Sequence, residues 1–108
     1  MRNQYKIGRS IEYKLISQIR SLYKKAGKEE GTDFEIIRTA GSHSSYDVIL
    51  FDYKDNEVHC WQLRETARGY YDKKEFRKFQ CNPRILSFFK HYWVWKRSIG
   101  WILQFNED

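Results

Sequence analysis

The sequence predicts an α/β domain in which helices pack on a mixed sheet. Helical periodicity near the start is followed by three strand-forming stretches, a polar helical stretch, and two aromatic strand-forming stretches. The expected order of elements is therefore α-β-β-β-α-β-β. A chain of 108 residues has the length of one domain with one core, so we expect residues 1–108 to form a single domain.

A first helix is predicted from apolar residues that repeat every three or four positions between Ile11 and Ala26. Ser10 is a candidate for its N-cap, and Gly27 is expected to end it. The apolar face of this amphipathic helix should pack on the sheet.

Three strands should follow. Residues 33–39 contain β-branched and aromatic side chains that favour a strand, and residues 41–45 form a loop of small and polar residues. Residues 46–52 and 57–64 form two further strands, and the short polar connection between them indicates a hairpin.

The C-terminal third should supply helix and then strand. Residues 71–79 and 84–90 have a helical pattern, interrupted at Pro83, so one or two helices are expected. Residues 92–97 and 99–105 predict a final strand pair. The tryptophans are expected in the core or at a dimer interface. Alternation places Trp93 and Trp95 on one strand face, which would form an exposed apolar platform suited to such an interface.

The composition favours a polyanionic partner. Lys and Arg total 20 against 14 Asp and Glu, which gives a formal charge of +6 and a pI near 9.4. The alternative is a basic surface that binds nothing acidic. Cys60 and Cys81 have no metal-ligand spacing and are expected to be reduced. Neither a membrane span nor a signal-peptide core is present, so we expect a soluble, cytoplasmic protein.

Candidate chemistry begins at Asp47, the carboxylate that opens the second predicted strand after a Gly/Ser turn. There it can offer oxygen ligands to a hard cation. Gln62 and Arg64 alternate with apolar residues, so both should lie on one face and meet Asp47 across the hairpin. The alternatives are a turn aspartate and a solvent-facing strand edge.

Glu12 is the third candidate. It lies near the predicted start of the first helix beside the apolar stripe, and helical spacing lets it point at the sheet margin. Its alternative role is to complement the helix dipole.

The segments that carry a family resemblance are Gly8-x-x-x-Glu12, then Arg38-Thr-Ala-Gly-Ser42 leading to Asp47, then Gln62-x-Arg64. This pattern resembles the archaeal Holliday junction resolvases of the PD-(D/E)XK nuclease superfamily. The resemblance covers residues 8–80 and is most specific in its middle segment. It implies a restriction-endonuclease-like αβββαβ core with a mixed central sheet flanked by helices.

The resemblance also implies roles for individual residues. Glu12, Asp47 and Gln62 would hold Mg²⁺, with Mn²⁺ as a substitute, and Ser42 would contact the scissile phosphate or order the neighbouring loop. Arg38 would bind phosphate through its guanidinium fork. His43 is a candidate from its position in the loop beside Ser42 and not from the resemblance: it would contact a DNA phosphate or relay a proton, and the alternative is plain surface. The implied partners are four-way or otherwise branched DNA and a second copy of the chain, in DNA recombination and repair.

Two residues depart from the family pattern. Gln62 stands in place of an acid; its amide oxygen can still coordinate a cation, with weaker affinity. Arg64 stands in place of a lysine, and because the pKa of a guanidinium is roughly 12.5–13.8, it is a poor proton acceptor. Arg64 would instead stabilise charge on the phosphate or orient the attacking water.

A basic and aromatic segment follows the third predicted strand. Helical spacing places Lys74 and Lys78 on one face with Arg77 close by, suited to a DNA backbone, and Arg68 precedes them. A solvated helix face is the alternative interpretation.

These observations predict a metal-dependent endonuclease that resolves Holliday junctions by hydrolysing phosphodiester bonds. Within this class, a nickase or a non-specific nuclease stays open. The alternatives outside it are a nuclease-fold DNA-binding protein with weakened or no catalysis, and a protein-interaction domain with an incidental basic surface.

Overall fold

The computed structural model describes residues 4–39, 46–81 and 88–107, with side chains placed from Ser10 to Asn106 within these ranges. Its elements are α1 (Gln4–Lys25), β1 (Phe34–Arg38), β2 (Val48–Asp52), β3 (Glu57–Thr66), α2 (Lys73–Cys81), β4 (Phe88–Lys96) and β5 (Gly100–Glu107). The predicted order α-β-β-β-α-β-β is confirmed over the described residues.

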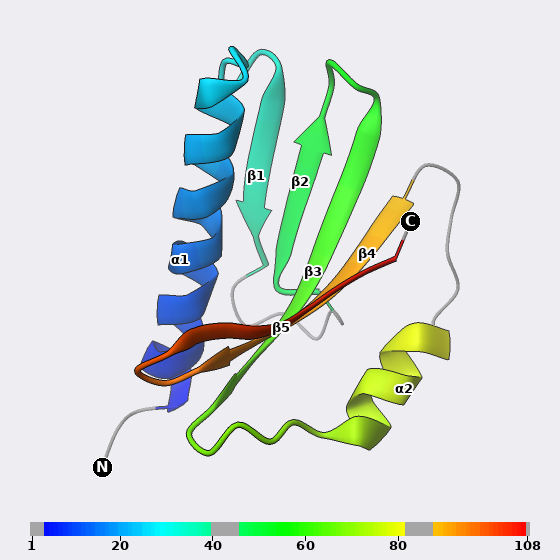
Figure 1. Cartoon of the computed structure of the whole chain (residues 1–108). Helices are drawn as coiled ribbons and strands as arrows, with labels where there is room; N and C mark the ends of the chain where they lie inside the picture. Colours follow the sequence, from blue (N-terminus) through cyan, green and yellow to red (C-terminus); the bar gives the residue numbers. More distant parts are fainter. Residues whose placement is uncertain (1–3, 40–45, 82–87, 108) are drawn as a thin grey trace.

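The five strands form one mixed sheet in the order β1-β2-β3-β4-β5. Strands β3 and β4 are parallel, and every other neighbouring pair is antiparallel. A parallel pair needs a long crossover, and α2 lies in the connection between β3 and β4 (Figure 1). The protein is therefore an α/β fold with a five-stranded mixed sheet and two helices.

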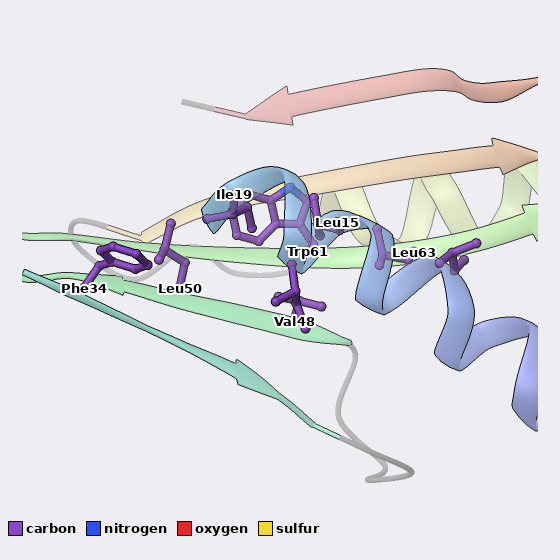
Figure 2. Packing of buried hydrophobic residues seen from close by; sticks show 9 residues of the cluster. Leu15, Ile19, Phe34, Val48, Leu50, Trp61 and Leu63 are labelled. Atoms are coloured by element: carbon purple, nitrogen blue, oxygen red, sulfur yellow. The ribbon is translucent and has the colours of Figure 1, made fainter. Parts of the chain in front are cut away.

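Helix α1 covers one face of the sheet. Its apolar stripe packs against side chains from β1, β2 and β3, and Figure 2 shows Leu15 and Ile19 gathered with Trp61 above Val48 and Leu50. Burying one such side chain contributes about 1.5–3 kcal/mol. The predicted packing of the apolar face of the first helix on the sheet is therefore confirmed.

Helix α2 packs on the opposite face. Phe79 is buried against Tyr92 and Val94 of β4. In the parallel register Gln62 pairs with Tyr92, and Leu63 pairs with Trp93, which packs on the α1 side. Successive residues of β3 therefore point alternately toward α1 and toward α2, and both faces of the central strands are covered by a helix.

Several expected boundaries are wrong, most by about two residues. Ser10 is not an N-cap, because α1 begins at Gln4. The helix can extend to the N-terminal side of Ser10 because no proline precedes that residue and the one glycine there, Gly8, costs only about 1 kcal/mol. Residues 88–90 are strand, not helix, because pairing with β3 overrides their local pattern. Strand β3 continues to Thr66. The rest of the second helical stretch and Pro83 lie outside the described residues.

The tryptophans are partly core. Trp61 is 5% exposed, whereas Trp93, Trp95 and Trp101 are partly buried and pack against the same cluster with edge-to-face ring contacts. The core interpretation is thus confirmed for Trp61, and the dimer interface stays a prediction.

The described cysteines are both free, and Cys60 is buried. Burial raises the pKa of the Cys60 thiol to about 12, which makes it unreactive at neutral pH. Among the described residues, no helix is long and apolar enough to cross a membrane.

Candidate active site

Asp47 lies directly before β2, and the backbones on either side hold it in place. We call this end of strands β2 and β3 the Asp47 edge. The backbone carbonyl of Asp47 accepts a hydrogen bond from Thr39 N at 3.0 Å, and its N–H donates to the Trp61 carbonyl at 2.7 Å. The carboxylate Oδ2 accepts from the backbone N–H of Leu63 at 2.8 Å. The carboxylate therefore binds the backbone of β3, which a role confined to its own turn does not predict; most of that turn, residues 40–45, lies outside the described residues.

Arg64 meets Asp47 across the hairpin, as predicted. Its Nη1 lies 3.6 Å from Asp47 Oδ2 and donates to the Leu63 carbonyl at 2.6 Å. Its Nε lies 2.5 Å from Glu75 Oε1. The guanidinium therefore joins the start of β2 to helix α2.

Gln62 lies on the same face of β3 as Arg64, two residues earlier in the strand, where it pairs with Tyr92 of β4. Its neighbour Trp61 pairs with Val48 and packs on the α1 side, so Gln62 points to the opposite side with Arg64. The residue is only 6% exposed. The solvent-facing edge is thus wrong for Gln62, because β3 is the central strand.

Glu75 is a member of this site that the sequence did not indicate. It lies in the first turn of α2, where Asp72 caps the helix by accepting from the N–H groups of Lys74 and Glu75 at 2.9 and 3.2 Å. Its Oε1 also accepts from the hydroxyl of Tyr92 at 2.8 Å. An acid in the first turn of a helix usually complements the helix dipole, so Glu75 does not stand out in the sequence. The one further indication of a role at the site is that Arg64, near the end of the preceding strand, is basic.

Glu12 pairs with Arg38 at the side of α1. Arg38 Nη1 donates to Glu12 Oε2 at 3.0 Å, and the two side chains are 14% and 19% exposed, with Glu12 the more buried. Glu12 lies well inside α1, and the first turn of the helix contains no acid, so the dipole interpretation is wrong. Arg38 also lies over the ring of Tyr13, 5.2 Å from its centroid.

The electrostatics of Asp47 connect these groups. Burial raises the pKa of Asp47, the Leu63 N–H and Arg64 oppose this, and the negative charges of Glu12 and Glu75 raise the pKa further. Carboxylates of α1 and α2 therefore act on the carboxyl group of Asp47. Asp47 and Glu75 are about a quarter exposed, at 26% and 27%, so a ligand from solvent can reach both.

A second acidic group lies at the other end of the same hairpin. Carboxylate oxygens of Asp52, Asp55 and Glu57 lie within 4.8 Å of one another, close enough for one cation. The Lys28 ammonium already lies 2.7 Å from Asp52 and 2.6 Å from Asp55. These contacts make the group a structural clasp.

The predicted DNA-binding residues divide into three sets. Ser42 and His43 lie outside the described residues. Arg38 is paired with Glu12, as described above. Exposed positions are occupied by Arg68, Lys74, Arg77 and Lys78. The three on α2 lie away from Phe76 and Phe79, which pack on the sheet.

Two histidines without a sequence partner meet in the fold. His59 Nδ1 lies 2.9 Å from His91 Nε2, and the rings stack at 5.2 Å. His91 Nδ1 is 2.7 Å from Asn106 Oδ1. The parallel register of β3 and β4 creates this contact, which spacing along the chain does not reveal.

The side chains around Asp47 are of the types that bind a hard cation, but Glu12, Asp47 and Glu75 are not gathered around one point. Among the described residues, only the carboxylates of Asp52, Asp55 and Glu57 form a group whose ligand atoms lie within 4.8 Å of one another. Carboxylate oxygens of Glu12, Asp47 and Glu75 and the amide of Gln62 are the ligand types that Mg²⁺ prefers. The Arg64 guanidinium is the positive group that meets the carboxylates of Asp47 and Glu75.

Comparison of the chain with protein-family models, with curated proteins and with solved structures gives no match. Its family is therefore an interpretation that depends on the sequence pattern and on the geometry of the Asp47 edge.

Proposed function

We propose that this protein is a Mg²⁺-dependent, structure-selective DNA endonuclease with a restriction-endonuclease-like αβββαβ core. The observation that carries the proposal is the meeting of Asp47, Arg64 and Glu75 where the central strands end. The order α1-β1-β2-β3-α2-β4 and the mixed sheet support the proposed core. The resolvase-like pattern of the sequence supplies the substrate, a four-way junction.

The metal would be held by Asp47, Glu12 and the Gln62 amide, as the resemblance implies, with Glu75 as a fourth oxygen donor from α2. When bound, Mg²⁺ supplies an activated water and offsets charge on the phosphate. The protein contributes a carboxylate that cannot rotate freely, because Leu63 N–H holds Asp47 Oδ2.

Arg64 would stabilise the phosphate as charge develops during attack. Its guanidinium is oriented by Glu75, whose carboxylate is oriented in turn by the Tyr92 hydroxyl. A positioned cation of this kind lowers the barrier without exchanging a proton. Arg64 is accordingly a charge-stabilising residue in the proposed mechanism, not the base.

The exposed basic face of α2, formed by Lys74, Arg77 and Lys78, would contact the DNA backbone. Together with the formal charge of +6, it favours binding that weakens as salt rises. A symmetric cut of a junction needs two active sites, so the proposed working form is a homodimer.

The test is cleavage of a synthetic four-way junction in Mg²⁺ or Mn²⁺. We expect paired nicks, and we expect Asp47→Ala to reduce their rate on the order of a thousandfold. Asp55→Ala is the matched control, because Asp55 belongs to the exposed clasp, and this variant should cut normally. Nicks that survive Asp47→Ala would exclude the proposed site.

A second candidate is a DNA-binding protein of the same fold that does not cut. It is favoured by one observation: Gln62 lacks the charge of an acid, and Arg64 already compensates Asp47 and Glu75. Tight, salt-dependent junction binding without nicks in either metal would select this candidate. Absence of any salt-dependent binding would select a protein-interaction domain.

A further inference from the structure

A groove of about 580 Å³ runs between the N-terminal half of α1 and the turn that joins β4 to β5. Figure 1 shows this turn lying beside α1, away from α2. The groove is lined by Ser10, Tyr13, Lys14, Ser17, Gln18, Trp95 and Trp101. Its volume is in the range of small-molecule and cofactor sites.

The aromatic wall of the groove is held in place. Trp101 Nε1 donates to Gln18 Oε1 at 3.1 Å, and the rings of Trp95 and Trp101 meet edge to face at 5.0 Å. Tyr13 is 48% exposed on the facing helix. Rigid aromatic rings at an open groove provide stacking surfaces for flat ligands.

The groove is also cationic. Lys14 Nζ lies over the Trp95 ring, 5.1 Å from its centroid, and its hydrogen bond to Ser10 is exposed. None of the described residues that line the groove is acidic. Through Tyr13, the groove adjoins Arg38 and hence Glu12 of the candidate active site.

We propose that this groove binds unpaired nucleotides of the DNA strand that enters the candidate active site. A base would stack on Tyr13 or Trp95, and phosphates would lie at Lys14 and Arg38. Stacking on aromatic rings is tolerant of sequence, as a structure-selective protein requires. The inference rests on the proposed function for its ligand class and deepens it by naming unpaired strand as a recognised feature.

Lys14 covers the stacking face that a base would use in this arrangement. In the free protein its ammonium occupies the face of Trp95. A base that takes that face frees the ammonium to pair with the adjoining phosphate. The polar lining from Ser10, Ser17 and Gln18 favours this ligand over a second copy of the chain, because the cores of such interfaces are depleted of lysine and serine.

The test measures binding of a short oligothymidine and of a matched duplex to the full chain by tryptophan fluorescence. Tyr13→Ala and Lys14→Glu should each weaken oligothymidine binding about tenfold or more. Duplex binding should change less. Lys25→Glu is the control, since it makes the same charge change at an exposed position in the last turn of α1.

Equal losses in Lys14→Glu and Lys25→Glu, or equal losses for both DNA forms, would overturn the inference. So would a change in sedimentation of the Lys14→Glu protein, which would mark the groove as a contact between copies. The two proposals fail separately. If Tyr13→Ala binds oligothymidine normally and still cuts junctions, only the groove proposal is excluded. If binding depends on the groove but the wild type does not cut junctions, only the nuclease proposal is excluded.

Discussion

The two ends of β2 each carry a buried or half-buried aspartate, and their environments are opposite. Asp52, 1% exposed, is compensated by Lys28, and hydrogen bonds from Lys28, Asp55 N–H and Tyr23 outweigh burial, so its pKa is lowered. Asp47 is paired only with Arg64, at 3.6 Å, among the described residues, and burial raises its pKa. One end is a clasp that stabilises the fold.

The other end holds charge that the fold does not fully compensate. Burial and two neighbouring carboxylates disfavour the charged form of Asp47. Residues with raised pKa in a reachable cleft are candidates for binding or catalysis, because a ligand can supply what the fold lacks. The comparison therefore favours the Asp47 edge, and not the more compact acidic group, as the site of the proposed function.

The same amide substitution at the two ends should change stability in opposite directions. Asp52→Asn should lower the free energy of unfolding at pH 7 by about 2 kcal/mol, because Lys28 loses its most buried partner. Urea denaturation of the variant and the wild type measures this loss.

The pH dependence follows from the lowered pKa. The wild-type advantage is complete above the ordinary aspartate pKa of about 3.9 and is lost as the pH falls through the lower value of the folded protein. A loss of stability that is independent of pH between 7 and 3 would mean that Asp52 acts through packing alone.

Asp47→Asn should raise the free energy of unfolding at pH 7, on the order of 1 kcal/mol. The amide oxygen can still accept from Leu63 N–H, while the buried negative charge is removed. Because the pKa of Asp47 is raised in the folded protein, its charge lowers the free energy of unfolding of the wild type. This loss is absent below the ordinary pKa of about 3.9, grows as the pH rises from there, and is complete above the raised pKa of the folded protein.

The stability gain should therefore disappear in acid while cleavage is lost at neutral pH. Denaturation at several pH values, beside the junction assay, measures both. A variant that is less stable than the wild type at pH 7 would show that the Arg64 contact outweighs burial, and the contrast between the two ends would be wrong.

The smallest expected effect concerns Arg64. Arg64→Lys should lower the cleavage rate about threefold, less than 1 kcal/mol in the barrier, because a lysine keeps the positive charge but loses the fork that Glu75 orients. Rates measured from pH 6 to 9 should show the same loss at each pH. A higher rate that increases with pH would show that the site lacks a lysine that handles protons, and the charge-stabilising role of Arg64 would be wrong.

Much of the fold could be predicted from periodicity. Alternation in β3 placed Gln62 and Arg64 opposite Trp61, and the hairpin brought Arg64 to Asp47 as expected. Boundaries were less predictable, because the residues at 88–90 have a helical pattern that strand pairing overrides. Helix α1 extends beyond its apolar stripe, so the stripe could not indicate where it begins.

By itself, the sequence determined the order of elements, the faces of the central strands and the position of Asp47, since these depend on local periodicity and on a short hairpin. Only the tertiary structure decided that Glu75 joins the site and that Arg38 pairs with Glu12, because α2 and α1 reach these positions by packing. It also decided which aspartate of β2 is compensated. Lys28 is far from Asp52 in the chain, and only the docking of α1 beside the hairpin brings the two charges together.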